Sequence, residues 1–321
     1  MHMYTRDEAH LMAQVARLYY DNNLTQEDVA RRLKLSRQKV SRLLGEARAQ
    51  GIVKITIYDP NPADPNLRED LKRRFRLSNV VLASGGNLEG EQLRAAIGLA
   101  ASEYLPEVIR DDQAIGVGWG RTLFEAINLL RGDGARRISV IPLIGGLGDI
   151  SPFFQVNELA RRLAEAFSGT YRHLYAPAFL QDDLVLESML KTPEVAVVTD
   201  LWKRLDLAVV GIGHVGFQEI SSMFFADHIH PETVAQLEAR GAVGDICGRF
   251  YDQEGNQVYP LTGVIGIDLE TLKTIPEVIA IAGGTEKVRA VLGALRGGYV
   301  KTLVTDTATA RAVLAEDGER R

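Results

Sequence analysis

The chain has 321 residues, of which 46% are hydrophobic and 25% are charged, an ordinary globular composition with enough apolar side chains for a sizeable core. Its one cysteine, Cys247, excludes a disulfide framework and a cysteine-rich zinc site, and suits a reducing cytoplasm. The first ten residues are polar and charged, and no run of 18 apolar residues occurs. We therefore expect a cytoplasmic protein without a signal peptide or a membrane-spanning helix.

Charge is distributed unevenly along the chain. Residues 1–58 contain ten Lys and Arg against six Asp and Glu (+4), whereas the rest contains 27 against 36 (−9). Eight basic residues and one acidic residue lie between Val29 and Tyr58. This asymmetry suggests a polyanionic partner for the N-terminal segment, although charge alone would fit a solvated helix face equally well.

The N-terminal segment has the spacing of a helix-turn-helix. A first helix is predicted over residues 6–22, with Leu11, Val15, Leu18 and Tyr19 on one face. Thr25 and Ser36 can each cap a further helix, and Asp28 lies three residues after Thr25, as in a capping box. The apolar positions predicted to pack in these two helices are Val29, Ala30, Leu33, Val40, Leu43, Leu44 and Ala47.

The turn between the two capped helices departs from the usual pattern, because many such motifs have Gly where this chain has Lys34. The alternative interpretation is a structural helical hairpin with no ligand. Cap spacing, apolar pattern and positive charge all agree with DNA binding instead, so we expect double-stranded operator DNA as a partner.

Side chains on the second capped helix are predicted to contact bases. Arg and Gln can form bidentate contacts with guanine and adenine in the major groove. Cations around the motif suit phosphates; these are Arg31, Arg32, Lys34, Lys39 and Arg48. The predicted DNA-binding set is Thr25, Gln26, Ser36, Arg37, Gln38, Lys39, Ser41 and Arg42. Residues 52–59 alternate like a strand and could form a wing, so residues 1–58 are predicted to be a winged helix-turn-helix domain.

Three prolines in residues 59–66 exclude a helix or a central strand there, and predict a linker. A helix over residues 67–75 is expected to open the second domain, residues 67–321. That domain repeats one arrangement. An apolar run ends in a Gly-rich loop, and a helical pattern follows the loop. The runs are VVLASGG (80–86), AIGVGWGRT (114–122), ISVIPLIGGLG (138–148), LAVVGIGHVG (207–216) and VIAIAGG (278–284), with a final strand VKTLVTD (300–306).

Strands alternating with helices predict an α/β domain with a doubly wound, mostly parallel sheet. Its Gly-rich loops would gather at the carboxyl ends of the strands, where ligands bind. Glycine amides and helix N-termini favour phosphate or another anion there; the alternative is that the loops are only tight turns. No GxGxxG is followed by an acidic residue about twenty positions later, so a nicotinamide cofactor fits poorly and no cofactor is predicted.

Two further groups of residues were considered for chemistry. His214, His228 and His230 lack carboxylates at ligand spacing and are interpreted as loop residues, so no metal site is predicted. Cys247 is interpreted as a small packed side chain rather than a nucleophile.

The whole chain resembles the SorC family of bacterial sugar-responsive transcriptional regulators. The resemblance rests on LTQEDVARRLKLSRQKVSRLLGEARAQGIVKI, GVGWGRT, GAVGDICGRFYDQEGN and IPEVIAIAGGTEKVRAVLGALRGGYVKTLVTD. It implies an effector domain similar to sugar-phosphate isomerases of the ribose-5-phosphate and glucosamine-6-phosphate type. It also implies a phosphorylated sugar or related metabolite as effector, control of a carbohydrate catabolic operon, usually by repression, and a homo-oligomer (a tetramer or dimer of dimers).

The resemblance also implies which residues bind the effector. Asp245 would accept hydrogen bonds from sugar hydroxyls, and the ammonium of Lys287 would pair with phosphate. The alternatives are that Trp119 packs in the core, that Asp245 caps a loop and that Lys287 is solvated. Residues 175–183 would vary with the sugar. The implied set is Gly118, Trp119, Gly120, Arg121, Thr122, Gly145, Gly146, Leu147, Asp245, Gly283, Gly284 and Lys287.

An isomerase remains as the alternative function. Asp245 and Lys287 could carry protons, and Lys287 could form a Schiff base with an aldehyde sugar. The intact DNA-binding motif, and the lack of a paired acid and base at a recognisable spacing, favour a regulator without catalytic residues.

Overall fold

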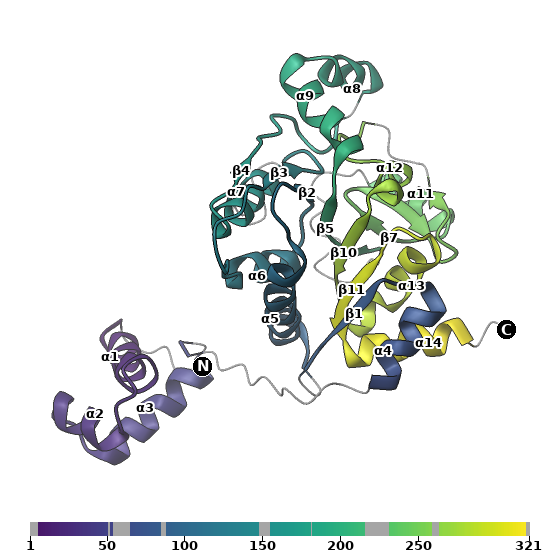
Figure 1. Ribbon diagram of the computed structural model, residues 1–321. Coiled ribbons are helices and arrows are strands. Elements are labelled where there is room, and N and C mark those ends of the chain that lie inside the picture. The colour runs from purple at the N-terminus through teal and green to yellow at the C-terminus, as the bar shows by residue number, and fades with distance from the viewer. Residues whose placement is uncertain are drawn as a thin grey trace. The chain divides into compact units, whose positions relative to one another are not determined.

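A computed structural model of the chain describes residues 6–50, 52–53, 65–84, 88–147, 155–180, 182–215, 231–258 and 263–318. The chain divides into two compact units, Met1–Ile57 and Tyr58–Arg321 (Figure 1). Within the described residues, no helix is both long and apolar enough to cross a membrane.

The described residues of the N-terminal unit form three helices. They are α1 (Arg6–Ala16), continued by a π-helical turn (Arg17–Asp21), α2 (Gln26–Leu33) and α3 (Arg37–Ala49). The hydroxyl oxygen of Thr25 accepts a hydrogen bond from the Asp28 amide at 3.2 Å, and that of Ser36 accepts one from the Lys39 amide at 3.1 Å. Both predicted caps are thus confirmed, and each satisfies an amide that has no partner within its helix.

The apolar faces of α2 and α3 are buried as their spacing predicted. Leu33 is only partly buried, but the other predicted positions on these helices have 6% exposure or less and pack with Met12, Val15 and Ala16 of α1. Lys34 ends α2 with φ 54° and ψ 41°, the left-handed conformation that favours Gly. The turn therefore has the left-handed backbone conformation of the usual motif, with Lys34 at the position where many such motifs have Gly. The predicted wing, residues 52–59, lies mostly outside the described residues.

A seven-stranded parallel sheet forms the centre of the second unit. Its strands are β1 (Asn79–Ala83), β2 (Ala114–Val117), β3 (Ser139–Pro142), β4 (Thr170–Tyr171), β5 (Leu207–Gly211), β10 (Glu277–Ile281) and β11 (Thr302–Asp306). Their order is β1-β11-β10-β5-β2-β3-β4, and every pairing is parallel. This confirms the predicted α/β class. From β2 the chain continues outward to β3 and β4, and from β5 it continues the opposite way to β10 and β11, so the sheet has a topological switch point between β2 and β5.

Helices cover both faces of this sheet (Figure 1). One face carries α5 (Gly90–Val108), α6 (Arg121–Leu129) and α7 (Val156–Ala166), and the other carries α4 (Pro65–Phe75), α13 (Val288–Arg296) and α14 (Thr307–Gly318). The remaining helices are α8 (Asp183–Leu190), α9 (Pro193–Leu201), α11 (Pro231–Ala239) and α12 (Leu269–Thr274). The start of α4 corrects the prediction that residues 59–66 contain no helix. Pro65 is tolerated because the first residue of a helix needs no amide donor.

A second, antiparallel sheet was not predicted from the sequence. It consists of β6 (Gly213–His214), β7 (Ala242–Ile246), β8 (Arg249–Asp252) and β9 (Gln257–Val258), and α13 packs against β7 and β8. The β7–β8 hairpin turns through Cys247 and Gly248, with φ of 52° and 74°. Positive φ at both central residues matches the right-handed twist of the strands. Cys247 is buried there, as its packing interpretation predicted.

Candidate functional site

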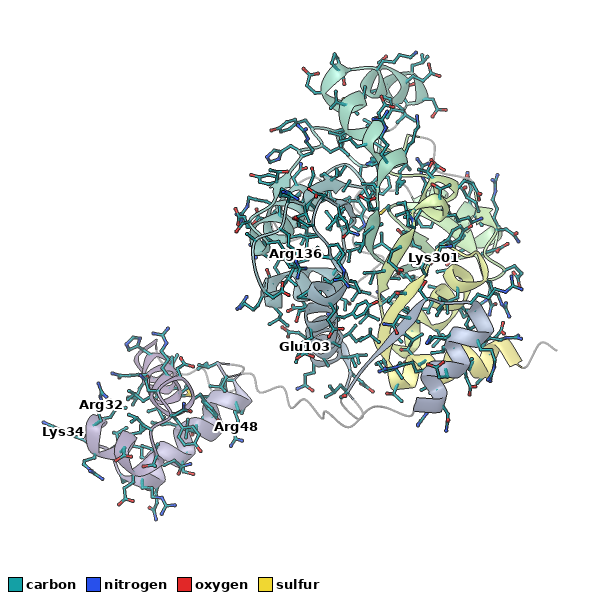
Figure 2. The ribbon with its side chains drawn as sticks, viewed as in Figure 1. Arg32, Lys34, Arg48, Glu103, Arg136 and Lys301 are labelled. Atoms are coloured by element: carbon teal, nitrogen blue, oxygen red, sulfur yellow. The ribbon has the colours of Figure 1, made fainter. Side chains whose placement is uncertain are left out.

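The DNA-facing residues predicted in the N-terminal unit are accessible. Arg37, Gln38, Ser41 and Arg42 are exposed on α3. Thr25, Ser36 and Lys39 are also exposed, and Gln26 is half-buried. The hydroxyls of Thr25 and Ser36 already serve as helix caps, so they orient the two helices whatever else they contact. Figure 2 shows the side chains of Arg32, Lys34 and Arg48 on the surface of this unit.

In the second unit, the switch point places the loop after β2 beside the end of β5. A Cβ atom on Gly211 would lie 2.6 Å from the carbonyl oxygen of Trp119, so only glycine allows this close approach. Gly120 precedes α6 with φ 143°, and no side chain caps this helix. The first turn of α6 therefore starts at the carboxyl edge of the sheet, where its positive end favours an anion.

Three cations from three separate elements influence one another near this edge. Arg121 opens α6, Lys287 ends a short 3₁₀ turn (Thr285–Lys287) after β10, and Arg94 lies in the second turn of α5. Burial lowers the pKa of Arg121, and the charge of Arg94 lowers it further. Like charges within electrostatic range of one another favour the binding of an anion between them.

Lys287 connects this group of cations to Asp245. Its ammonium group donates a hydrogen bond to the Ile212 carbonyl oxygen at 2.8 Å, directly after β5. Burial lowers the pKa of Lys287, and the charges of Arg94 and Arg121 act in the same direction, whereas Glu286 and Asp245 oppose them. Lys287 is thus within electrostatic range of both arginines and of the Asp245 carboxylate.

Asp245, in β7, is a buried carboxylate with an unused acceptor. The residue is 3% exposed, and its Oδ2 accepts a hydrogen bond from the Gly248 amide at 3.1 Å. Oδ1 has no hydrogen-bond partner among the described residues. A Cβ atom on Gly213 would lie 1.9 Å from Oδ1, so glycine at that position leaves room for the carboxylate. Burial raises the pKa of Asp245 to about 6, against the Gly248 amide and the Lys287 charge. A buried acceptor without a donor matches a ligand hydroxyl.

Most glycine amides in the predicted loops are committed to the fold, contrary to the expectation that they would face a ligand. The amide of Gly118 donates to Val209 at 2.9 Å, and those of Gly145 and Gly146 donate to Ile265 and Ala176 at 2.8 Å each. The amide of Gly284 donates to the side chains of Asp306 and Thr309. These four glycine amides therefore position the strand ends and are not available to an anion.

The other predicted residues surround this centre. Trp119 is half-buried, with its ring 6.3 Å from that of Phe179, and Thr122 is buried in the first turn of α6. Leu147 is buried in the main core, and Gly283 packs closely against Asp306. No contact places Gly145, Gly146 or Leu147 beside the charged group within the described residues.

Arg94 was missed in the sequence analysis although a signal existed. The strand–loop–helix units that start with β1, β2 and β10 each place a basic residue, Arg94, Arg121 and Lys287, soon after the loop. The repeat was recognised, but this shared charge was not. No group of three or more metal-ligating side chains occurs in the described part of the chain. His214 lies in β6, whereas His228 and His230 fall outside the described residues.

Comparison with known proteins places both units. The family model described as "Putative sugar-binding domain" matches residues 60–315, and the model of sigma-70 region 4, a helix-turn-helix region, matches residues 11–50. The sorbitol operon regulator of Klebsiella pneumoniae is 32% identical over 319 residues, which cover 97% of this chain and all of that protein. The chain belongs to the SorC family.

Other relatives agree with this SorC-family assignment. The full-length crystal structure of the Klebsiella pneumoniae regulator SorC superposes with a TM-score of 0.74 at 31% identity, over 97% of this chain and 100% of that one. The deoxyribonucleoside regulator of Bacillus subtilis is 29% identical over 313 residues, 96% of this chain and 98% of that protein. This SorC-family chain is a DNA-binding transcriptional regulator with a sugar-binding effector domain.

Proposed function

We propose that this regulator represses a carbohydrate catabolic operon and that a phosphorylated sugar, bound at the β2–β5 switch point, releases it from operator DNA. One observation carries the proposal: the Lys287 ammonium, held by the Ile212 carbonyl oxygen, lies within electrostatic range of Arg94, Arg121 and the buried, under-satisfied carboxylate of Asp245. Cations select a phosphate, and a carboxylate oxygen selects a hydroxyl donor. A sugar phosphate carries both groups in one small molecule.

The division of labour follows the two units. Residues 1–58 would bind DNA, residues 59–66 would connect, and residues 67–321 would bind the effector and form the oligomer. Two relatives are named for sorbitol and for deoxyribonucleosides, which are polyhydroxylated compounds, and this supports a ligand that needs the Asp245 acceptor. A homo-oligomer, as a tetramer or dimer of dimers, would present paired helix-turn-helix units to a two-fold operator.

The same site argues for a regulator rather than an isomerase. The Lys287 ammonium is held by the Ile212 carbonyl oxygen and lies among like charges, which suits binding a phosphate. An isomerase needs an acid and a base on either side of a reacting carbon, whereas Asp245 accepts from the Gly248 amide and faces the charge of Lys287. We expect no turnover of ribose 5-phosphate or glucosamine 6-phosphate.

The test is fluorescence anisotropy with a labelled duplex from the native upstream region. A panel of ribose 5-phosphate, glucosamine 6-phosphate and fructose 6-phosphate is titrated against the unphosphorylated sugars and inorganic phosphate. We expect at least one sugar phosphate to weaken DNA binding by tenfold or more, which is about 1.4 kcal/mol of coupling. Lys287→Met should bind DNA normally and lose this response. Failure to bind the duplex at low salt, or release by an unphosphorylated sugar alone, would contradict the proposal.

A further inference from the structure

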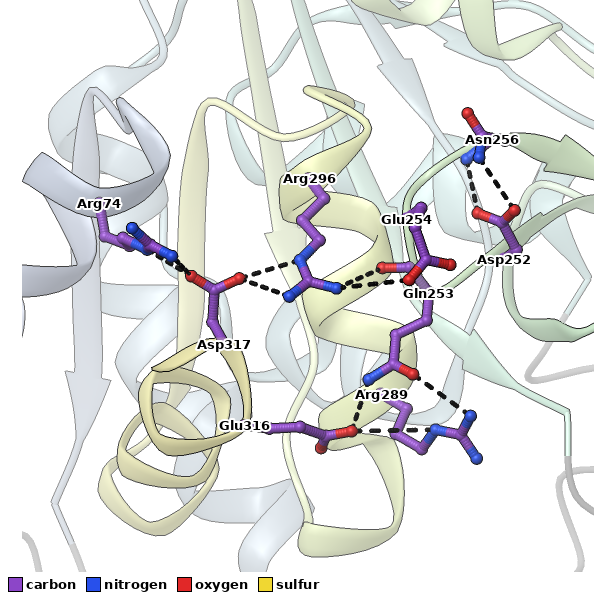
Figure 3. A network of polar contacts seen from close by, with 9 residues as sticks. All are labelled: Arg74, Asp252, Gln253, Glu254, Asn256, Arg289, Arg296, Glu316 and Asp317. Atoms are coloured by element: carbon purple, nitrogen blue, oxygen red, sulfur yellow. Dashed lines mark hydrogen bonds and ion pairs between the residues drawn. The ribbon is translucent and has the colours of Figure 1, made fainter. Parts of the chain in front are cut away.

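We propose that a cluster of ion pairs around Asp317 transmits effector binding to α4, the helix that follows the chain segment joining the two units. The proposal rests on the proposed function, because it assigns the route by which that effector acts. Asp317, near the end of α14, is 5% exposed. It accepts hydrogen bonds from Arg296 at 2.9 and 2.7 Å and a further one from Arg74 of α4, as Figure 3 shows.

The first arm of this route is α13. Lys287 immediately precedes this helix and Arg296 is its last residue, so the two ends of one rigid element hold an effector-site cation and the Asp317 cluster. Nine helical residues span about 13 Å. Seven of those nine residues are buried, so the helix is fixed by packing along its length and can shift only as a unit.

The second arm is the antiparallel hairpin. Asp245 lies in β7, which pairs with β8, and β8 ends at Asp252. The next two residues contact Arg296: its guanidinium donates to the Gln253 carbonyl oxygen at 3.2 Å and lies 3.8 Å from the Glu254 carboxylate. The helix that follows Lys287 and the hairpin that contains Asp245 therefore both lead to Arg296.

Further contacts hold α14 to these two arms. The Gln253 side-chain amide donates to Glu316 at 2.5 Å, and its oxygen accepts from Arg289 of α13 at 3.3 Å. A displacement of α13 or of the hairpin is thus passed to α14, which presents Asp317 to α4 (Figure 3).

Arg74 differs from its basic neighbours in α4. Lys72 and Arg73 form ion pairs within the helix, with Glu69 and Asp70, and Arg73 is 79% exposed. Arg74 instead leaves its own helix to bind Asp317, and its side chain is 29% exposed. Arg296 still compensates the Asp317 carboxylate when Arg74 moves away, so the Arg74 contact can be made or broken without leaving the buried charge unpaired. That property suits a switch with two discrete arrangements.

The experiment compares Arg74→Gln and Asp317→Asn with Arg162→Gln in the full-length protein. Arg162 is a matched control, because its side chain is 31% exposed and pairs with Glu158 at 2.7 Å on the opposite face of the sheet. The probe is the sugar phosphate of the panel above that releases DNA from the unchanged protein most strongly. For each variant, DNA affinity is measured with and without a saturating probe, and probe affinity is measured without DNA by calorimetry.

We expect Arg74→Gln and Asp317→Asn to bind free DNA and free probe within about threefold of the unchanged protein, while the release ratio falls from tenfold or more to less than threefold. Arg162→Gln should keep the full ratio, and the double variant should lose no more than either single one. If Asp317→Asn fails to fold, Arg74→Gln and the milder Arg74→Lys still decide the question. Retention of the full ratio in Arg74→Gln overturns this inference alone, whereas no release from the unchanged protein overturns the proposed function as well.

Discussion

Asp245, the proposed acceptor for a sugar hydroxyl, is a residue whose burial costs stability. Its carboxylate is buried, one oxygen has no donor among the described residues, and burial raises its pKa to about 6. Because the folded state holds the proton more tightly than the unfolded state, stability decreases as the pH rises from about 4 to about 6 and then stays level. At neutral pH the Asp245 carboxylate is therefore ionised in the folded protein, although burial makes this ionisation less favourable than in the unfolded chain.

Asp245→Asn should stabilise the second unit at pH 7.5 by about 2 to 3 kcal/mol and should abolish the sugar-phosphate response. The amide keeps the shape of the side chain and an oxygen for the Gly248 amide, but it removes the charge and replaces the second acceptor oxygen with an NH2 donor. Urea unfolding between pH 4.5 and 7.5 measures the effect, which should shrink steadily toward the acidic end. Lower stability of the variant at pH 7.5 would show that Lys287 more than compensates for the buried charge.

At the scale of single elements, the turn of the helix-turn-helix offers a separate test. Lys34 adopts φ 54°, a conformation that costs a residue with a Cβ atom about 1 to 2 kcal/mol relative to glycine. Lys34→Gly and Lys34→Ala both remove the charge, and only the first relieves this strain. We expect the free energy of unfolding of the N-terminal unit to be about 1 kcal/mol higher in Lys34→Gly than in Lys34→Ala.

Thermal unfolding of the two Lys34 variants, followed by circular dichroism, gives the difference directly. Both variants should weaken DNA binding to a similar extent, since each lacks the same cation. Equal stability of the two would mean that the left-handed turn is not the conformation of Lys34 in solution.

Elements were predictable where local spacing determines them. The capping side chains of Thr25 and Ser36 predict two helix starts, and the alternation of apolar strands with helices predicts the parallel sheet. The β7–β8 hairpin escaped prediction because its residues were interpreted only through a family motif, although Cys247 and Gly248 form a two-residue turn between strands. The residues of the site could be named individually, but their convergence, and that of Arg94 with them, depends on strand order, which local sequence does not encode.

At the scale of the whole molecule, the division of charge has a measurable consequence. The N-terminal segment carries +4 and the remainder −9, so favourable electrostatic contact with DNA should come from the helix-turn-helix units alone. Five cations in each unit are predicted to face phosphates: Arg31, Arg32, Lys34, Lys39 and Arg48. Arg31 lies 3.4 Å from Asp28, but this exposed pair is weak enough to exchange for a phosphate.

The salt dependence of DNA binding should therefore increase with the number of helix-turn-helix units bound to an operator. Each neutralised phosphate contributes about −0.9 to the slope of log K against log salt, so one unit gives at most about −4.5 and two units about −9. Anisotropy titrations between 50 and 250 mM KCl, on a complete operator and on a half-site duplex, should give slopes near these two values. Arg48→Gln should reduce the operator slope by about 2, one phosphate for each of two units, and the half-site slope by about 1. A slope near −4.5 on the complete operator, with an oligomer seen by sedimentation, would show that the oligomer engages DNA through a single unit.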